Sequence, residues 1–250
     1  MLLLGGTADA RRLAGDLARR PGFDVLLSLA GRTAHPAPQP VPVRVGGFGG
    51  AEGLARFLED ADFDVVVDVT HPYAAIMSRN AAEACARARR PLLAVRRAPW
   101  EAQAGDRWRD VDDVAHAIAA LGQAQRRVFL ALGRNEVRAF EAAPQHIYVV
   151  RSVDPVLPPL RVPHATYLVA RGPFEAGDEE RLLAAHGVDI VVAKNSGGPS
   201  TYGKMAAARA LGIEVLLLRR PLTPDVEAVE DAQAALAWLE ARRHEALRGV

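Results

Sequence analysis

The sequence predicts an α/β protein made of two doubly wound halves with mainly parallel sheets, and a cofactor and substrate cleft between them. Three observations support this fold class. Apolar runs and amphipathic stretches alternate along most of the chain, as in βαβ units. Several apolar runs are continuous Val, Leu and Ile, which is typical of strands covered on both faces. The composition also shifts at residues 96–110, RRAPWEAQAGDRWRD, so we divide the chain into residues 1–98 and 99–250.

The alternation predicts each element in turn. The expected strands are Met1–Leu4, Asp24–Ala30, Val41–Val45, Asp64–Val69, Leu92–Arg96, Arg127–Leu132, His146–Arg151, Thr166–Ala170, Asp189–Ala193 and Glu214–Leu218. The expected helices are Ala8–Arg20, Ala51–Asp60, Ala75–Arg89, Val111–Leu121, Glu136–Ala142, Asp178–His186, Ser200–Leu211 and Asp225–Arg243. The proline-rich stretches HPAPQPVP and DPVLPPLRVPH are expected to be extended surface loops.

The charge and composition disfavour several classes of protein. The net charge is +1, so the chain lacks the basic excess of a nucleic-acid-binding protein. No apolar run reaches the roughly 18 residues that cross a bilayer. The first residues, MLLLGGTADARRLAG, lack the basic region of a signal peptide. The single cysteine, Cys85, fits a reducing cytoplasm and a buried place in a helix. We expect a cytoplasmic protein with no nucleic-acid or membrane partner.

The first strand runs directly into Gly5, Gly6 and Thr7, after which a helix begins. A glycine turn at this place directs backbone N–H groups and the positive end of the helix dipole towards a phosphate. The complete pattern G-x-G-x-x-G is absent, because Ala8 and Ala10 stand where dinucleotide-binding domains usually have glycine. A tight turn without a ligand is the alternative. The position at the first strand of a βαβ unit favours a phosphate site.

The end of the second strand bears on the choice of dinucleotide. NAD-binding folds place an acidic residue about 20 residues after the glycine turn, whereas an arginine accepts the 2′-phosphate of NADP. Residues 28–33 read SLAGRT, with Arg32 and no carboxylate. Arginine can hold a phosphate through two parallel hydrogen bonds. The segment favours NADP(H), and the alternative is an ordinary surface arginine in an arginine-rich chain.

The third and fourth strands also end in unusual loops. The third ends in VGGFGG, residues 45–50, where four glycines surround Phe48 and suggest close backbone approach to a flat or charged group. The fourth ends in DVTHPY, residues 68–73. Because proline follows it, His71 is expected in the loop at the carboxyl end of the strand, where ligands bind in open α/β sheets. His71 is a candidate proton donor; cofactor packing and loop fixation are the alternatives.

Positive residues follow the ends of many strands. They are Arg96, Arg97, Arg134, Arg151, Arg171, Lys194, Arg219 and Arg220. Because the carboxyl ends of parallel strands share one edge, such residues create positive potential there. We expect a ligand with several carboxylates or phosphates, although arginine is common enough that some strands end in it by chance.

Lysine occurs only twice among 31 Lys and Arg residues, and both lysines fall in KNSGGPSTYGK, residues 194–204. A lysine supplies a compact ammonium with a tunable pKa, unlike the planar guanidinium of arginine. Lys194 ends a strand, and a turn rich in hydrogen-bond donors follows it. Tyr202 and Lys204 are two positions apart. They therefore do not share a helical face, as the Tyr-x-x-x-Lys pair of short-chain dehydrogenases does, and that mechanism is disfavoured.

Five segments together resemble the precorrin-6A reductase family of cobalamin biosynthesis, also described as precorrin-6x reductases. They are LLLGGTADARRLA, SLAGR, VGGFGG, DVTHPYA and VAKNSGGPSTYGKMAAARALGIEVLLLRRP, and they run from the first strand to the last. The resemblance implies a Rossmann-like enzyme in which residues 1–98 bind NADP and residues 99–250 bind substrate. It implies reduction by NADPH of one ring double bond of precorrin-6A, a tetrapyrrole-derived macrocycle with acetate and propionate side chains, to give precorrin-6B.

The resemblance also implies roles for individual residues. Gly5, Gly6 and Thr7 would hold the pyrophosphate, and Arg32 with Thr33, beside Ala30 and Gly31, the 2′-phosphate. The remaining cofactor contacts would come from Gly46, Gly47, Phe48, Thr70, His71, Pro72, Asn195, Ser196, Gly197 and Gly198. Lys194, Tyr202, Lys204 and His71 are candidate positioning groups or proton donors, with water as the alternative donor. Substrate carboxylates would meet Arg96, Arg134, Arg151, Arg171 and Arg219, and no metal site is expected.

Other functions stay open at this point. The sequence does not separate precorrin-6A from cobalt-precorrin-6A as substrate. Another NADPH reductase with a polyanionic substrate is a second alternative. A redox sensor that binds NADP(H) without turnover is a third, but it would leave the strand-end cations and the lysine segment without a role. Arg32 counts against a methyltransferase of the same pathway, because such folds usually place an acid there. Transient contact with neighbouring pathway enzymes is the protein partnership that we expect.

Overall fold

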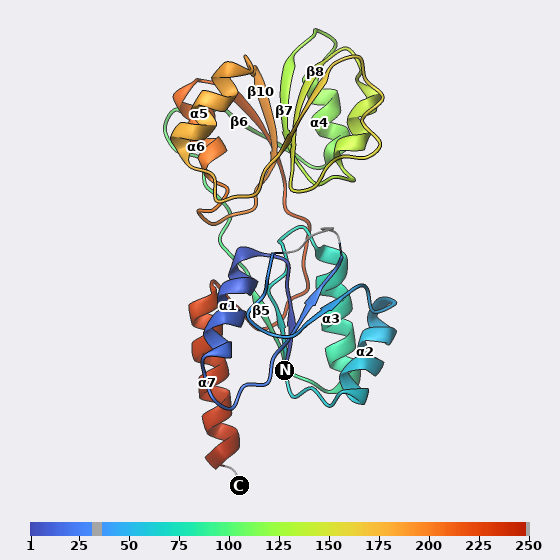
Figure 1. The fold of residues 1–250 in the computed structure, drawn as a ribbon, viewed down its shortest axis with the longest axis vertical. Coiled ribbons are helices and arrows are strands. Elements are labelled where there is room, and N and C mark those ends of the chain that lie inside the picture. The colour runs from blue at the N-terminus through green and yellow to red at the C-terminus, as the bar shows by residue number, and fades with distance from the viewer. Residues whose placement is uncertain (32–36, 249–250) are drawn as a thin grey trace. The chain divides into compact units, whose positions relative to one another are not determined.

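The structure is a computed structural model that describes residues 1–31 and 37–248. The chain forms two compact units, the first from Met1–Ala98 and Pro221–Val250 and the second from Pro99–Arg220 (Figure 1). Each unit contains a six-stranded parallel sheet covered by helices. The predicted α/β class with two parallel sheets is confirmed. Within the described residues, no helix has both the length and the apolar character needed to cross a membrane.

The first sheet has the strand order β12-β5-β4-β1-β2-β3. Its strands are β1 (Leu2–Leu4), β2 (Leu26–Leu29), β3 (Val43–Val45), β4 (Val66–Asp68), β5 (Leu92–Val95) and β12 (Ala228–Val229). The helices α1 (Ala8–Ala18) and α7 (Ala232–Arg248) lie on one face of this sheet, and α2 (Gly50–Asp60) and α3 (Ala75–Ala88) on the other (Figure 1).

The strands of this unit are nearly continuous apolar runs because helices cover both faces of the sheet. Side chains alternate between the faces of a strand. Leu3 therefore packs against the α1 and α7 side, whereas Leu2 and Leu4 join the cluster beneath α2 and α3. Cys85 of α3 is buried in that second cluster, as expected for a packing role.

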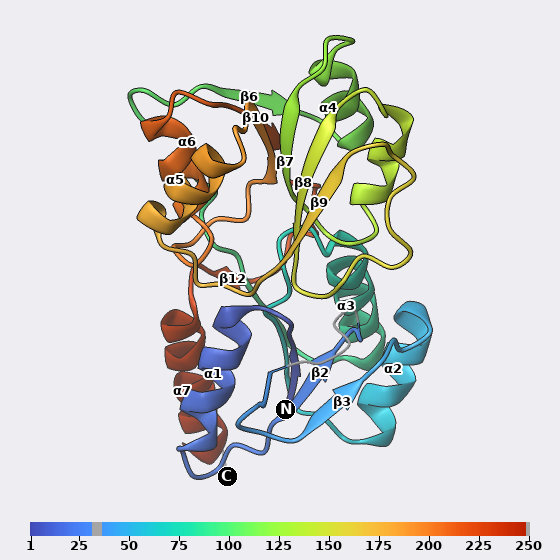
Figure 2. The ribbon, with the colours of Figure 1, turned by 45° about the horizontal axis from the view of Figure 1, so that its top comes forward.

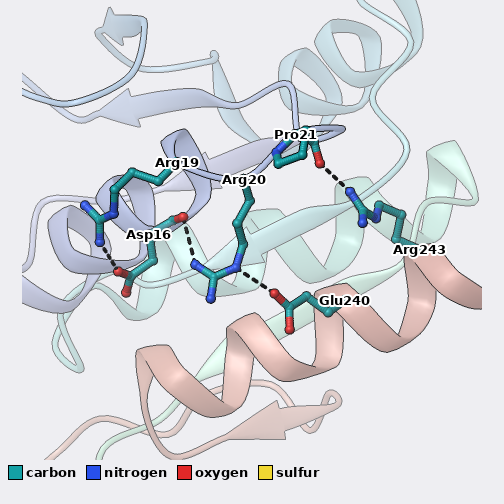
Figure 3. Close-up of polar contacts among 6 residues, drawn as sticks. All are labelled: Asp16, Arg19, Arg20, Pro21, Glu240 and Arg243. Carbon is teal, nitrogen blue, oxygen red and sulfur yellow. Dashed lines mark hydrogen bonds and ion pairs between the residues drawn. The ribbon is translucent and has the colours of Figure 1, made fainter.

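The last helix belongs to the first unit, which corrects the predicted division at residues 99–250. The helix was expected at Asp225–Arg243, but residues 228–229 form β12 beside β5, and α7 begins at Ala232. Arg20, just after α1, donates to Glu240 of α7 over 2.6 Å and to the carbonyl of Asp16 over 3.0 Å (Figure 3). Arg243 donates to the carbonyl of Pro21. These contacts and the shared apolar core attach α7 to α1.

The second sheet has the order β6-β11-β10-β7-β8-β9. Its strands are β6 (Trp108–Val111), β7 (Arg127–Ala131), β8 (Ile147–Ser152), β9 (Ala165–Val169), β10 (Ile190–Lys194) and β11 (Glu214–Leu218). The helices α5 (Ala176–Ala185) and α6 (Gly203–Ala210) pack together on one face, and α4 (Val114–Leu121) lies on the opposite face (Figure 2).

Two local predictions in the second unit were wrong. A helix was expected from Val111, but that residue ends the edge strand β6, and α4 starts after Asp113, whose side chain accepts from the backbone N–H of His116. The strand was missed because Arg109 and Asp110 are exposed and give it little apolar pattern. The helix expected at Glu136–Ala142 is the 3-10 turn η1 (Val137–Ala142).

Candidate functional site

The order of the first sheet reverses between β1 and β4: the chain continues from β1 to β2 and β3 on one side, and from β4 to β5 on the other. Loops leave the two central strands in opposite directions at such a point, and the crevice at the carboxyl ends of the strands is where ligands bind in doubly wound sheets. The two loops here are Gly5–Thr7 and Val69–Tyr73. The structure therefore brings the predicted phosphate turn and the predicted His71 loop to one place.

The turn after β1 is shaped by its glycines and by Thr7. A Cβ atom on Gly5 would lie 2.5 Å from Leu27 Cδ1 and would displace that side chain, and Gly6 has φ +111°, a conformation that favours glycine. Thr7 is the N-cap of α1 and accepts from the backbone N–H of Ala10 over 3.1 Å. Its hydroxyl donates to the carbonyl of Val69 over 2.8 Å. The turn thus fixes the positive end of α1 at the crevice, which suits an anionic group.

Asp68, which the sequence-based reasoning did not single out, organises the opposite loop. Its buried carboxylate accepts from the backbone N–H and hydroxyl of Thr70 over 3.0 and 2.6 Å, and from Ser78 of α3 over 2.7 Å. Arg96, after β5, donates to it over 2.8 Å. Burial acts to raise the pKa of Asp68, but the charge of Arg96 and these hydrogen bonds outweigh it, and the pKa lies below its usual value. Thr70 is therefore a buried anchor of the loop.

His71 and Pro72 follow this anchor and are half-buried. The backbone N–H of Tyr73 donates to His71 Nδ1 over 3.3 Å. With Nδ1 acting as an acceptor, a neutral imidazole carries its proton on Nε2. The ring centroids of His71 and Tyr73 are 5.6 Å apart. The loop therefore fixes the orientation of the His71 ring through the backbone of Tyr73.

The glycine loop after β3 depends on Arg44. Its guanidinium donates to Ser28 Oγ over 3.1 Å and to the carbonyls of Gly46 and Gly47 over 2.8 and 3.0 Å. The same group lies 3.8 Å from the centroid of the Phe48 ring. The ends of β2 and β3 are therefore joined, with Ala30 and Gly31 exposed beside them. Arg32 and Thr33, expected at the 2′-phosphate, lie outside the described residues.

The order of the second sheet reverses between β10 and β7. Lys194 ends β10, and its Nζ lies 2.6 Å from Glu136 Oε1, in the loop after β7. The other carboxylate oxygen accepts from the backbone N–H of Gly133 over 2.8 Å. Glu136 was not among the predicted site residues, because an acid after a strand is common and nothing nearby in sequence connects it with Lys194. This pair places one charged contact at the switch point of the second sheet.

The turn after Lys194 is held by Trp100. The Asn195 side chain accepts from Trp100 N over 2.7 Å and donates to Trp100 O over 2.9 Å. The indole N–H of Trp100 donates to the carbonyl of Gly198 over 2.8 Å. Gly197 and Gly198 have positive φ angles of 67° and 72°, so glycine is needed at both. The structure thus contains an ordered turn at residues 195–198. The Asn195 side chain, which was expected to contact the cofactor, instead forms hydrogen bonds with the main chain of Trp100.

Lys204 and Tyr202 differ in their burial and in their hydrogen-bond partners. Lys204 is only 4% exposed, and its Nζ donates to the carbonyl of Thr201 over 2.6 Å. Tyr202 is half-buried, and its hydroxyl accepts from Arg209 over 3.1 Å. Burial, with a smaller contribution from the charge of Arg151, lowers the pKa of Lys204 to about 7, and Glu179 opposes the shift. Lys204 is thus placed inside the unit rather than at its edge.

The positive residues that follow the strands differ in their burial and in their ion-pair partners. Arg151, expected to bind substrate carboxylates, is instead buried in an ion pair with Glu179, because β8 directs it inward between the Phe129 and Phe174 rings. Arg219 is exposed and lies 2.6 Å from Asp112, next to a cavity of about 370 Å³ at the edge of the sheet rather than at the switch point. Arg134 is half-buried and Arg171 exposed.

Arg96 and Arg97 both act within the first unit. Arg96 is bonded to Asp68, with 22% of its side chain exposed, and Arg97 lies 3.0 Å from Asp9 in the first turn of α1. Among the residues that the structure describes, no group of three or more His, Cys, Asp or Glu side chains could hold a metal ion. The switch point of the first sheet thus carries the capped start of α1, and that of the second carries the Lys194–Glu136 pair.

Comparison with known proteins assigns the chain to one family. Residues 1–240 match the family model described as Precorrin-6x reductase CbiJ/CobK. A precorrin-6A reductase of Sinorhizobium sp is 54% identical over 236 residues, covering 94% of this chain and 90% of the relative. The precorrin-6A reductase of Rhodobacter capsulatus is 48% identical over 239 residues, covering 96% of this chain and 95% of the relative.

More distant relatives and a solved structure complete the comparison. A cobalt-precorrin-6A reductase of Priestia megaterium is 28% identical, covering 88% of this chain and 90% of the relative. The solved structure described as CobK precorrin-6A reductase superimposes with a TM-score of 0.92 at 48% identity, covering 96% of this chain and 95% of that one. The similarity therefore extends over both units of the fold.

Proposed function

The chain belongs to the precorrin-6x reductase family, and on this premise we propose that it catalyses the NADPH-dependent reduction of precorrin-6A to precorrin-6B in cobalamin biosynthesis. The observation that carries the proposal is the switch point of the first sheet, where the glycine turn and the capped end of α1 meet the His71 loop. A nicotinamide dinucleotide with its pyrophosphate on the helix end suits this geometry.

The first unit fits a dinucleotide. A Cβ atom on Gly6, Gly46 or Gly47 would meet no atom within 4 Å, so the backbone at these loops is open to close approach. Gly5, Gly6 and Thr7 would hold the pyrophosphate. Thr70 and Pro72 would shape the nicotinamide end through the loop that Asp68 anchors. We assign the cofactor to the first unit and the macrocycle to the second.

NADPH is favoured over NADH by the residues that follow β2. Residues 28–33 contain no carboxylate, and Arg32 lies where a residue that binds the 2′-phosphate is expected. Arg44 is a poorer candidate, because its guanidinium already donates to Ser28, Gly46 and Gly47. We therefore assign the 2′-phosphate to Arg32 and Thr33.

The metal-free macrocycle is the favoured substrate. The precorrin-6A reductase relatives are 54% and 48% identical to this chain, whereas the cobalt-precorrin-6A reductase relative is 28% identical. The acetate and propionate groups of such a substrate need cations, and Lys194, Arg134 and Arg171 follow strands of the second sheet at its carboxyl edge. Arg151 is withdrawn from this role because it is buried with Glu179.

The chemistry requires a hydride at one carbon of the ring double bond and a proton at its neighbour. Bound NADPH would supply the hydride. The chain offers two candidate groups for the proton, the imidazole of His71 and the ammonium of Lys194, which lies 2.6 Å from Glu136. Because the macrocycle delocalises charge, the main task of the protein is to orient the reactants and exclude water.

The test is anaerobic stopped-flow absorbance of the purified protein with NADPH and precorrin-6A. We expect loss of the reduced-nicotinamide band together with a change in the macrocycle spectrum. Parallel runs with NADH and with cobalt-precorrin-6A separate the cofactor and substrate forms, and both are expected to be slower. Binding of NADPH without change in either chromophore would reject the proposed reaction.

A further inference from the structure

The segment that contains both lysines is supported from inside the second unit by Lys204. Its ammonium nitrogen lies 2.6 Å from the carbonyl oxygen of Thr201 and 4.8 Å from the centroid of the Trp100 ring. The side chain is almost fully buried. Lys204 therefore joins the first turn of α6 to a residue that lies far from it in the sequence.

Trp100 connects Lys204 with the turn at residues 195–198. Its backbone N–H and carbonyl form a pair of hydrogen bonds with the side chain of Asn195, and its indole N–H donates to the carbonyl of Gly198. Arg220 donates to the carbonyl of Asn195 over 2.7 Å. Two of these four bonds join the Asn195 side chain to the main chain of Trp100, and the other two end on the main-chain carbonyls of Asn195 and Gly198. Together they fix the path of the backbone between residues 195 and 198.

The surroundings of Lys204 favour lysine at this position in a chain that has only two lysines. A Cβ atom on the preceding Gly203 would lie 2.4 Å from the carbonyl oxygen of Phe174, so the start of α6 packs against another segment without spare room. A planar guanidinium is larger than an ammonium and needs more hydrogen-bond partners. The charged groups that face Lys204 are Arg151 from β8 and Glu179 from α5, and they are already paired with each other.

We infer that Lys204 is a positioning residue that, through Thr201 and Trp100, holds the Asn195–Gly198 turn in the shape needed for reduction. The inference deepens the proposed function and rests on it, since the turn is expected to surround the reacting ring. Of the two roles expected for Lys204, positioning and proton donation, the inference selects positioning. Lys194, at the start of the same segment, keeps that candidate role.

Two variants test this inference, and a third serves as control. Lys204→Met keeps the length of the aliphatic chain and removes the ammonium. Trp100→Phe keeps an aromatic ring and removes the indole donor, so it tests the next step of the same connection. The control is Arg126→Met, which removes an ion pair with Glu214 at the amino edge of the same sheet. Each variant is compared with the wild-type protein at full length.

The first measurement is hydrogen exchange of the backbone amides in residues 195–198, which needs neither substrate nor activity. We expect faster exchange in Lys204→Met and in Trp100→Phe and wild-type exchange in Arg126→Met. The inference is overturned if exchange in the turn is unchanged in both test variants. It is also overturned if exchange rises equally across the whole second unit, because that result means a general loss of stability.

The second measurement separates positioning from folding. We expect kcat with precorrin-6A to fall about tenfold in Lys204→Met, with little change in NADPH affinity, because small misplacement of a reacting group is costly. Lys204→Arg should not restore the rate, and restoration by arginine would contradict the need for lysine. If the wild-type enzyme reduces no corrin precursor, the proposed reaction fails, while the exchange data still decide whether Lys204 holds the turn.

Discussion

The hydroxyl of Thr7 and the carbonyl oxygen of Val69 form a hydrogen bond of 2.8 Å across the switch point of the first sheet. The same hydroxyl oxygen accepts from Ala10 and caps α1. One side chain therefore sets both the start of the helix expected to bind the pyrophosphate and its distance from the loop that carries His71.

Thr7→Ala should therefore weaken NADPH binding and destabilise the first unit. Loss of the cap is expected to cost about 1 kcal/mol of unfolding free energy, and affinity should fall about tenfold because the helix end is no longer held at the crevice. Thr7→Ser retains the hydroxyl and is the matched control. Calorimetric titration with NADPH and urea unfolding measure the two effects. Equal affinity of the Ala and Ser variants would exclude this role.

Asp68→Asn should destabilise the first unit at neutral pH by about 3 kcal/mol, because it leaves Arg96 without its partner. The pKa of Asp68 in the folded protein lies below 3.8, its usual value. Its stabilising contribution is therefore full above about pH 4 and is lost as the pH falls through the folded pKa. The two unfolding free energies should approach each other in acid. Asp60→Asn, at the exposed end of α2, is the control, and a constant difference at all pH values would contradict the assignment.

The sequence was sufficient to predict most of the fold because helices cover both faces of each sheet. Leu2–Leu4 and Ile190–Lys194 are short apolar strands followed by amphipathic helices, and both were predicted. The return of α7 to the first unit was not predictable from local pattern. It depends on pairing of Ala228 and Val229 with Ala94 and Val95, and on the packing of Leu236 and Leu239 in a core built by distant residues.

The site was predicted less completely, because charge partners are not visible in sequence. Arg96 and Arg151 both follow the strand-end pattern, yet their acids, Asp68 and Glu179, lie 28 positions away in each case. The structure shows that one cation organises a loop and the other is buried. Glu136 was missed for the same reason, since its relation to Lys194 arises only where β7 and β10 become neighbours.

Arg32→Ala should raise the Kd for NADPH at least tenfold and leave the Kd for NADH nearly unchanged. A guanidinium that grips the 2′-phosphate contributes only to the phosphorylated dinucleotide. Arg11→Ala, at an exposed position of α1, is the matched control. Parallel loss of affinity for both dinucleotides would mean that Arg32 acts on the loop and not on the phosphate.

Lys194→Met should lower kcat at saturating NADPH by about a hundredfold if its ammonium delivers or positions the proton. Glu136→Gln should cause a smaller loss, because it leaves the ammonium present but less firmly held. Stopped-flow reduction at saturating substrate measures both. NADPH affinity, measured separately, should be unchanged in either variant if the cofactor lies in the first unit. Wild-type turnover in Lys194→Met would remove this residue from the mechanism and leave His71 or water as the donor.

The stability of the second unit should rise with pH because of Lys204. Its pKa is about 7 in the folded protein and near 10.5 when unfolded, so between these values the unfolded chain binds more protons. The penalty for burying the charge is complete below about pH 7 and decreases as the pH rises, by at most about 1.4 kcal/mol per pH unit. From pH 7 to 9, the unfolding free energy of wild type should therefore rise by about 2 kcal/mol relative to Lys204→Met.

Tryptophan fluorescence can report this effect on the second unit alone. Trp100 and Trp108 lie in that unit, whereas Trp238 lies in α7 of the first. In a Trp238→Phe background, urea unfolding at several pH values therefore follows the unit that contains Lys204. Arg126→Met should show the same rise as wild type. Parallel pH dependence of wild type and Lys204→Met would mean that the buried amine keeps an ordinary pKa, since only a lowered pKa makes the unfolded chain bind the extra proton in this range.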